Sequence, residues 1–293
     1  MSGKIWFITG TSKGFGRVWA EAALTRGDRV AATARNVRML ASLVERFGER
    51  VAALTLDVTD KAAVYAAVAE AQARFGRLDV VVNNAGYGLF GAIEEVSEAE
   101  ARAQFETNVF GALWVTQAAL PILRAQRSGH IIQVSSVAGL NAFPTLGLYS
   151  ASKWALEGFS QALATEVAGF GIKVTLIEPA GYATDWSGAS SKRADQMPDY
   201  DEARAAIAAF RTNHVPGDPA ATGAAILKVV DAADPPLRIF FGAACLPMAR
   251  AEYGSRIAAW EKWNAVATEA QGSGQPSYVR DTLGAFASNS HDV

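Results

Sequence analysis

Cysteine and histidine are scarce in this sequence. Cys245 is the only cysteine among 293 residues, which excludes an intrachain disulfide framework and a zinc site built on cysteines. The three histidines, His130, His214 and His291, lie far apart along the chain. We therefore expect no metal site.

An excess of charge of one sign is also missing. The chain has 27 Lys and Arg against 29 Asp and Glu, a formal net charge of −2. Proteins that bind a phosphate backbone usually carry a cationic excess, so no nucleic-acid partner is expected. Half of the residues are apolar and 19% are charged, which excludes extended disorder and is enough for a large core.

Long apolar runs are absent as well. No segment reaches the ~18 consecutive apolar residues of a membrane span, and the longest apolar-rich stretch, Ile239 to Ala249, is interrupted by Gly242 and Pro247. The first residues do not follow the pattern of a signal peptide, because an apolar run begins directly after Lys4. We expect a cytoplasmic protein without a membrane span.

What the sequence does contain is an alternation of short apolar runs with segments of helical period. The runs are Ile5–Thr9, Arg29–Ala34, Val51–Leu56, Leu78–Val82, His130–Ser135, Lys173–Ile177 and Leu237–Phe241. The helical segments include Phe15–Arg26, Asp60–Phe75, Ala99–Gln126 and Tyr149–Phe170. This alternation predicts an α/β protein with one doubly wound, Rossmann-type domain, in which helices flank a seven-stranded parallel sheet.

A glycine-rich turn follows the first run. Gly10, Gly14 and Gly16 stand in the segment Thr-Gly-Thr-Ser-Lys-Gly-Phe-Gly, between a predicted strand and a predicted helix. A dinucleotide pyrophosphate needs a tight turn, close backbone approach and the positive end of a helix, which this segment could supply. The spacing differs from the general Gly-x-Gly-x-x-Gly pattern, and an ordinary strand-to-helix turn would also use glycine.

This turn resembles the Thr-Gly-x-x-x-Gly-x-Gly signature of the short-chain dehydrogenase/reductase family. Further elements follow in the order of that family: Asp57-Val58, Asn83-Asn84-Ala85-Gly86, Asn108, Ser136 and Tyr149-Ser150-Ala151-Ser152-Lys153. The resemblance spans roughly residues 4–245. It implies an NAD(P)(H)-dependent dehydrogenase or reductase that acts on CH–OH and C=O groups.

The candidate catalytic residues are Ser136, Tyr149, Lys153 and Asn108. Tyr149 and Lys153 are four residues apart and share one face of a helix. A free tyrosine has a pKa of about 10, and a nearby lysine ammonium and nicotinium ring both lower it toward the range of proton transfer. We expect Tyr149 to exchange a proton with the substrate oxygen and Ser136 to hydrogen-bond that oxygen; the resemblance implies that Asn108 holds a water linked to Lys153. A pair on a helix surface would show the same Tyr-x-x-x-Lys spacing.

The resemblance also implies which residues border the cofactor. Besides Tyr149 and Lys153 they are Gly10, Ser12, Lys13, Gly14, Phe15, Gly16, Arg35, Asp57, Val58, Asn84, Ala85, Gly86, Pro179, Gly181, Tyr182 and Thr184. One departure from the family occurs after Pro179, where Ala180 stands in place of a glycine.

The end of the second run favours NADP(H). An acidic residue there would hold a ribose 2′-hydroxyl and select NAD, but none is present. Arg35 instead follows the run, where a guanidinium suits a 2′-phosphate, and Lys13 supplies a second cation. If Arg35 only stacks on the adenine and Lys13 is solvated, NAD(H) remains the alternative.

Residues 182–217 are expected to form a helical lid over the substrate. The expected substrate-contacting residues are Tyr87, Leu89, Phe143, Leu146, Trp186 and Met197. Because this set is aromatic and apolar, it favours a hydrophobic ketone, aldehyde or secondary alcohol as the small-molecule partner.

Residues 1–245 are thus expected to form one dinucleotide-binding and catalytic domain. Residues 246–293 are expected to form a C-terminal helical extension and tail packed on that domain. The family commonly associates through two long helices, so we expect a homodimer or homotetramer. The most direct hypothesis is an NADPH-dependent carbonyl reductase; an epimerase or dehydratase on the same fold, and a non-catalytic NADP(H)-binding sensor, are left open.

Overall fold

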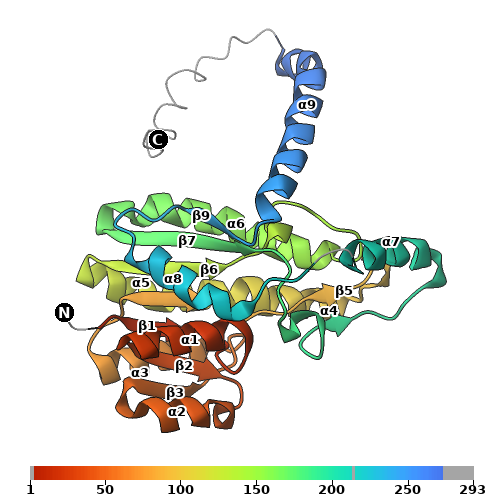
Figure 1. The fold of residues 1–293 in the computed structure, drawn as a ribbon. Helices are drawn as coiled ribbons and strands as arrows, with labels where there is room; N and C mark the ends of the chain where they lie inside the picture. Colours follow the sequence, from red (N-terminus) through yellow and green to blue (C-terminus); the bar gives the residue numbers. More distant parts are fainter. Residues whose placement is uncertain (1–2, 213–214, 273–293) are drawn as a thin grey trace. The chain divides into compact units, whose positions relative to one another are not determined.

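Seven parallel strands lie where the short apolar runs predict them. A computed structural model describes residues 3–212 and 215–272. The strands are β1 (Ile5–Ile8), β2 (Arg29–Ala34), β3 (Val51–Thr55), β4 (Val80–Asn83), β6 (Gly129–Val134), β7 (Ile172–Pro179) and β9 (Arg238–Phe241). Their order in the sheet is β3-β2-β1-β4-β6-β7-β9, with parallel pairing throughout. The predicted doubly wound, seven-stranded sheet is confirmed, and Figure 1 shows its arrangement.

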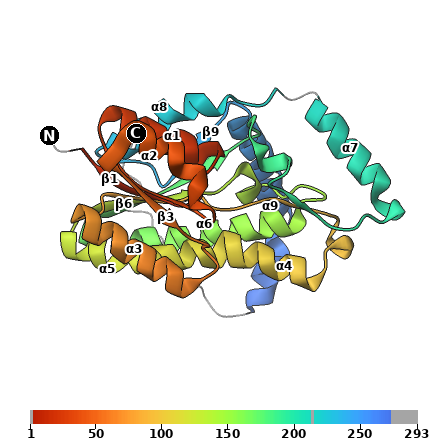
Figure 2. The ribbon, with the colours of Figure 1, turned by 90° about the horizontal axis from the view of Figure 1, so that it is seen from below.

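Helices cover both faces of the sheet (Figure 2). Ile5 and Phe7 of β1 pack in one core with α3 (Lys61–Phe75), α5 (Ala112–Gln126) and α6 (Gly147–Val167). Trp6 and Ile8 pack in the other with α1 (Gly14–Arg26), α2 (Ala41–Phe47) and α8 (Thr222–Asp231). Successive side chains of a strand point to opposite faces, so a strand buried on both faces must be apolar throughout.

The segment predicted as one helix over residues 99–126 is interrupted. α4 (Glu98–Phe105) leads into a π-helical turn (Glu106–Gly111), and α5 follows at Ala112. The turn allows Gly111 to approach Val58, since a Cβ on Gly111 would lie 2.7 Å from Val58 Cγ2. Such π-turns often occur at functional positions, and this one carries Asn108.

The lid region is less helical than the sequence predicts. Within residues 182–217 the described chain forms short 3-10 turns, a two-residue strand and one helix, α7 (Asp201–Thr212). The strand, β8 (Lys192–Arg193), pairs in parallel with β5 (Leu89–Phe90). A two-residue strand has no detectable period, so the sequence gives no sign of this small second sheet.

The chain divides into two compact units, residues 1–249 and 250–293. α9 (Cys245–Gln271) begins in the first unit and provides the described part of the second. The sequence pattern predicts that this helix ends at about Glu269, and in the structure it ends at Gln271. The predicted polar tail lies outside the described residues from position 273 onward, and the packing of residues 246–293 stays a prediction. Among the described residues, no helix combines the length and hydropathy that a membrane crossing requires.

Candidate active site

A cleft of about 890 Å³ opens at the carboxyl ends of the strands. The segments after β1, β2, β3, β4, β6 and β7 line it, as expected where the strand order of a doubly wound sheet reverses. Residues of the predicted cofactor set that line it are Gly10, Ser12, Lys13, Gly14, Phe15, Arg35, Asp57, Val58, Asn84, Ala85, Gly86, Tyr149, Lys153, Pro179, Gly181, Tyr182 and Thr184. The cleft therefore brings this set together, with Gly16 behind its surface.

The glycine-rich turn is bound closely to the segment after β4. Asn84 Nδ2 donates to the carbonyls of Thr9 and Gly10, at 2.8 and 3.0 Å. Thr9 Oγ1 accepts from the backbone N–H groups of Asn84 and Ala85. A Cβ on Gly16 would lie 2.5 Å from both Asn84 Nδ2 and the Gly10 carbonyl oxygen, so only glycine fits there.

The same turn has the features that a dinucleotide requires. Gly10 and Gly14 adopt φ of +69° and +60°, which bends the chain before α1. Lys13 is the N-cap of α1, and its side chain makes no capping hydrogen bond. The first N–H groups of α1 border the cleft, where they can bind an anion with the help of the helix dipole. The residues present thus fit a nicotinamide dinucleotide.

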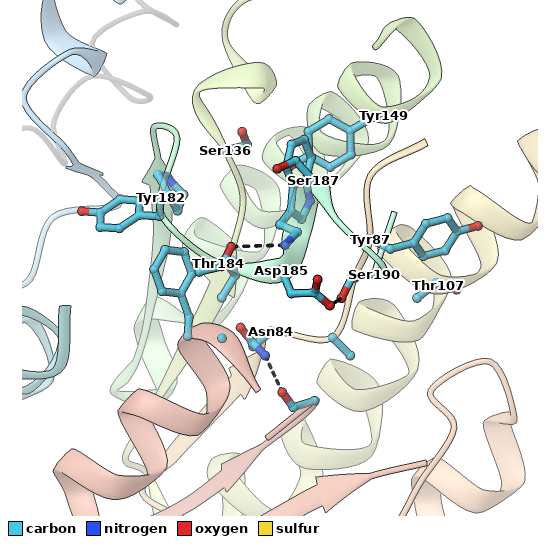
Figure 3. A pocket seen from close by; sticks show the side chains of 18 of the residues that line it. Asn84, Tyr87, Thr107, Ser136, Tyr149, Tyr182, Thr184, Asp185, Ser187 and Ser190 are labelled. Carbon is cyan, nitrogen blue, oxygen red and sulfur yellow. Dashed lines mark hydrogen bonds between the residues drawn. The ribbon is translucent and has the colours of Figure 1, made fainter. Parts of the chain in front are cut away.

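Ser136, Tyr149 and Lys153 meet on the floor of the cleft (Figure 3 shows Ser136 and Tyr149). Tyr149 is 5% exposed and Lys153 is 6% exposed. Lys153 Nζ donates to the carbonyl of Val134 at 2.8 Å and lies 5.7 Å from the centre of the Tyr149 ring. Tyr149 and Lys153 lie on α6, and Ser136 is the second residue after β6.

Burial controls the titration of both α6 residues. It raises the pKa of Tyr149 to about 12, although the Ser136 hydroxyl lowers it in part. Burial lowers the pKa of Lys153 to about 8, and the charge of Glu157 opposes this shift. The sequence predicts a lowered Tyr149 pKa from Lys153 together with a nicotinium ring, and this stays a prediction. Among the groups of the protein itself, burial of the phenol dominates.

Asn108 lies behind the cleft rather than on its surface. It is 2% exposed, and its amide donates to the Tyr87 carbonyl and to Ser152 Oγ, each at 3.1 Å. Its Oδ1 accepts from the Tyr87 N–H at 3.1 Å. A Cβ on Gly86 would contact Asn108 Oδ1 at 3.0 Å and Lys153 Nζ at 3.8 Å, so both groups flank one glycine. Asn108 therefore fixes the loop beside Lys153.

The two predicted cations at the adenosine end differ in their surroundings. Arg35 is exposed and lines the cleft after β2. Lys13 instead forms an ion pair with Asp185, from the lid. Asp185 also accepts from Ser190 Oγ at 2.8 Å and from the Ala189 N–H at 3.0 Å (Figure 3). These contacts lower the pKa of Asp185.

Aromatic and apolar side chains cover the catalytic tyrosine candidate. The Trp186 ring lies 5.0 Å from the Tyr149 ring and 5.4 Å from the Phe90 ring. Phe143 and Leu146 belong to the same apolar cluster. A Cβ on Gly88 would lie 2.6 Å from the Trp186 ring, so glycine is needed for this close approach. Among the predicted substrate residues, Tyr87, Phe143, Leu146 and Trp186 line the cleft.

Leu89 and Met197 do not line the cleft. Leu89 is buried, and its N–H donates to Gln104 Oε1 at 2.9 Å. The Met197 N–H donates to Glu95 Oε1 at 2.8 Å, which ties the lid to the segment after β5. Both residues lie in the expected region and stabilise its backbone.

Several lining residues were not predicted. From the lid they include Asp185, Ser187, Ser190, Lys192 and Ile207, and from elsewhere Ser135, Thr107 and Met248. Asp185, Ser187, Ser135 and Thr107 each adjoin a predicted residue in the sequence, and this adjacency was the available signal. The other lid residues follow a chain path that local sequence does not determine.

The family model for the short chain dehydrogenase matches residues 4–195. The chain belongs to this family. A curated oxidoreductase named BOA17 from Botryotinia fuckeliana (strain B05.10) is 45% identical over 89% of this chain and 96% of its own length. A 3-ketodihydrosphingosine reductase from Bacteroides thetaiotaomicron is 38% identical over 83% of this chain and 89% of its own length. This short-chain dehydrogenase is therefore an oxidoreductase.

Solved structures of the family superpose on this short-chain dehydrogenase. A short-chain dehydrogenase from Streptomyces avermitilis has a TM-score of 0.86 and 39% identity, covering 91% of this chain and 99% of its own. ElxO with NADP bound has a TM-score of 0.72 and 25% identity, covering 84% and 99%. A Burkholderia phymatum relative in complex with NAD has a TM-score of 0.74 and 27% identity, covering 85% and 92%. These neighbours support a nicotinamide cofactor.

Proposed function

We propose that this short-chain dehydrogenase is an NADPH-dependent carbonyl reductase. The observation that carries the proposal is the grouping of Ser136, Tyr149 and Lys153 on the buried floor of a cleft that also holds the glycine turn. When bound, the nicotinamide would supply hydride to the substrate carbonyl in reduction and accept it in oxidation. The protein supplies the position of the substrate and the proton.

Tyr149 is the proton donor in this proposal. A phenol with a pKa of about 12 is protonated throughout the neutral range, so it can donate to a carbonyl oxygen. Ser136 would hydrogen-bond the same oxygen. Lys153 keeps its positive charge below about pH 8 and would stabilise the phenolate once the proton has left.

The preference for NADP(H) is proposed from the adenosine end of the cleft. No carboxylate ends β2, and the exposed Arg35 follows it. Because Asp185 already balances Lys13, Arg35 is the residue that would carry most of the preference for a 2′-phosphate. NAD(H) is the alternative, and it is the cofactor bound to the Burkholderia phymatum relative.

We propose a hydrophobic ketone or aldehyde as the substrate. Trp186, Phe143 and Leu146 give the space above Tyr149 an apolar wall. The relative named as a 3-ketodihydrosphingosine reductase supports a ketone with a long apolar chain. The cytoplasmic location and the homodimeric or homotetrameric state stay predictions from the sequence.

The test is consumption of NADPH, and separately of NADH, with a panel of carbonyl compounds. The panel pairs each long-chain ketone and aldehyde with a short, polar analogue. We expect turnover with NADPH and higher kcat/KM for the apolar member of each pair. Tight NADPH binding without turnover of any compound would contradict the reductase proposal and favour the sensor hypothesis.

A further inference from the structure

A charged cluster that the proposed chemistry does not use lies close to Lys153. It consists of Glu157 on α6, Glu178 on β7 and Arg238 on β9. The side chains of Glu157 and Glu178 are 7% and 1% exposed. Arg238 Nε donates to Glu157 Oε2 at 2.8 Å and lies 3.5 Å from Glu178 Oε1. Arg238 Nη2 also donates to Gln161 Oε1 at 2.9 Å.

Two buried carboxylates beside one guanidinium carry one excess negative charge, which is costly away from water unless a nearby cation, such as the Lys153 ammonium, or a bound proton offsets it. Burial and the neighbouring Glu157 carboxylate raise the pKa of Glu178 well above its ordinary value. The raised pKa favours a proton on Glu178. Arg238 contacts Glu157 more closely than Glu178, at 2.8 Å against 3.5 Å.

Glu157 faces the candidate active site from one helical turn away. It follows Lys153 by four residues, so the two side chains lie on one face of α6. A Cβ on Gly139 would lie 2.8 Å from Ser135 Oγ and 3.3 Å from Glu157 Oε1. The Glu157 carboxyl therefore reaches the loop that begins with Ser136. Both oxygens are buried without a hydrogen-bond partner among the described residues.

We propose that Glu157 is a positioning residue that, paired with Glu178 and Arg238, keeps Lys153 in its ammonium form. The proposal rests on the proposed function, because the charge of Lys153 matters there for the phenolate of Tyr149. Cys245 also lies beside Glu178, with its Sγ 3.5 Å from the Glu178 carbonyl oxygen. Burial raises the pKa of this thiol to about 11, so it stays neutral.

Removing the charge of Glu157 should make Lys153 release its proton at lower pH. Glu157→Gln keeps the shape of the side chain and removes its negative charge. The lowering of the Lys153 pKa by burial is then less compensated. We expect the titration midpoint of Lys153 to fall by about one pH unit. Glu157→Asp keeps the negative charge, so its Lys153 midpoint should lie close to that of the unsubstituted protein. Glu178→Gln imitates the protonated partner and should change the midpoint much less than Glu157→Gln.

The measurement is an NMR titration of the cofactor-free full chain with ¹³C-labelled lysine. The Lys153 Cε resonance is assigned by its loss in Lys153→Arg. Glu166→Gln, an exposed position on the same helix, is the matched control and should leave the midpoint unchanged. An unchanged midpoint in folded Glu157→Gln, or an equal shift in Glu166→Gln, would overturn the proposal.

A second titration keeps the proposal testable if Glu157→Gln does not fold. In the unsubstituted protein with ¹³C-labelled glutamate, one buried carboxyl should remain protonated at neutral pH and should be lost in Glu178→Gln. A Glu157 carboxyl that stays protonated at neutral pH would overturn the proposal, because an uncharged carboxyl cannot stabilise the Lys153 ammonium. Neither titration uses substrate or turnover, so failure here is distinct from failure of the reductase proposal.

Discussion

The cleft has a nucleotide side, formed by the glycine turn and the segment after β4, and a lid side, formed by the described residues of 182–217 and the segment after β5. Different kinds of contact stabilise these two sides. On the nucleotide side, the amide of Asn84 and the hydroxyl of Thr9 bond to backbone groups of neighbouring strand ends. On the lid side, the ion pairs of Lys13 with Asp185 and of Glu95 with Arg204 join segments far apart in sequence. The first kind is buried backbone geometry that tolerates little change, whereas in the second kind the Lys13–Asp185 pair is exposed and its side chains can exchange partners.

The largest expected effect comes from Gly16→Val on the nucleotide side. The new Cβ would lie 2.5 Å from two backbone or amide atoms that are themselves bonded, so the turn must shift, at a cost of about 1–3 kcal/mol of folding free energy. We expect a lower Tm and loss of NADPH binding by fluorescence titration.

Gly158→Val on α6 is the control for added bulk, because a Cβ there meets no atom within 4 Å. It should bind NADPH normally. Equal binding by the Gly16→Val and Gly158→Val variants would show that the glycine turn does not hold the dinucleotide.

Trp186→Ala tests the lid side. This substitution should weaken substrate binding and leave NADPH binding unchanged. The ring covers Tyr149 and packs on Phe90, so its removal opens the apolar wall. We expect KM for an apolar ketone to rise about 10–100-fold, as for loss of a central aromatic contact, with an unchanged Kd for NADPH. Trp260→Ala, at an exposed position of α9, should change neither quantity; a weakened NADPH affinity in Trp186→Ala would remove the distinction between the two sides.

Arg35→Asp should shift the cofactor preference from NADPH toward NADH without affecting substrate binding. Loss of the guanidinium removes a charge-assisted contact of about 1.5–3 kcal/mol with a 2′-phosphate, and the carboxylate suits a ribose hydroxyl. The ratio of kcat/KM for NADPH to that for NADH should fall at least tenfold. Arg46→Asp, on the exposed surface of α2, serves as the charge control. A ratio unchanged from the unsubstituted enzyme would refute the assignment of Arg35.

The smallest effect is expected for Asp185→Asn. This variant releases Lys13 from an exposed ion pair between the two sides, and exposed pairs contribute little because water and salt screen them. We expect less than about a fivefold change in KM for substrate, and a difference that shrinks as the salt concentration rises. A large, salt-independent loss would mean that the lid side is as rigid as the nucleotide side.

The contrast between the nucleotide side and the lid side also explains which features the sequence could predict. The seven strands and the glycine turn were predictable because buried strands are apolar on both faces and a dinucleotide turn needs glycine at fixed places. Tyr149, Lys153 and Ser136 followed from spacing and from the family resemblance. All of these signals are local in the sequence.

What the sequence did not predict depends on contacts between distant segments. The pairing of β5 with β8 joins residues about a hundred positions apart through two-residue strands. The π-turn at Asn108 places Gly111 against Val58 of a distant segment, and the high pKa of Tyr149 follows from burial under Trp186 and its neighbours. None of these has a local period or motif.

The most direct test of the central claim is single-turnover reduction of an active ketone by Tyr149→Phe, with the Kd for NADPH measured on the same preparation. Phenylalanine keeps the ring that packs against Trp186 and removes only the hydroxyl. We predict a rate about 10²–10⁴-fold lower than that of the unsubstituted enzyme, the range expected for loss of a general acid, with NADPH affinity retained. A Tyr149→Phe variant that binds NADPH and reduces the ketone at the unsubstituted rate would contradict the assignment of Tyr149 as proton donor.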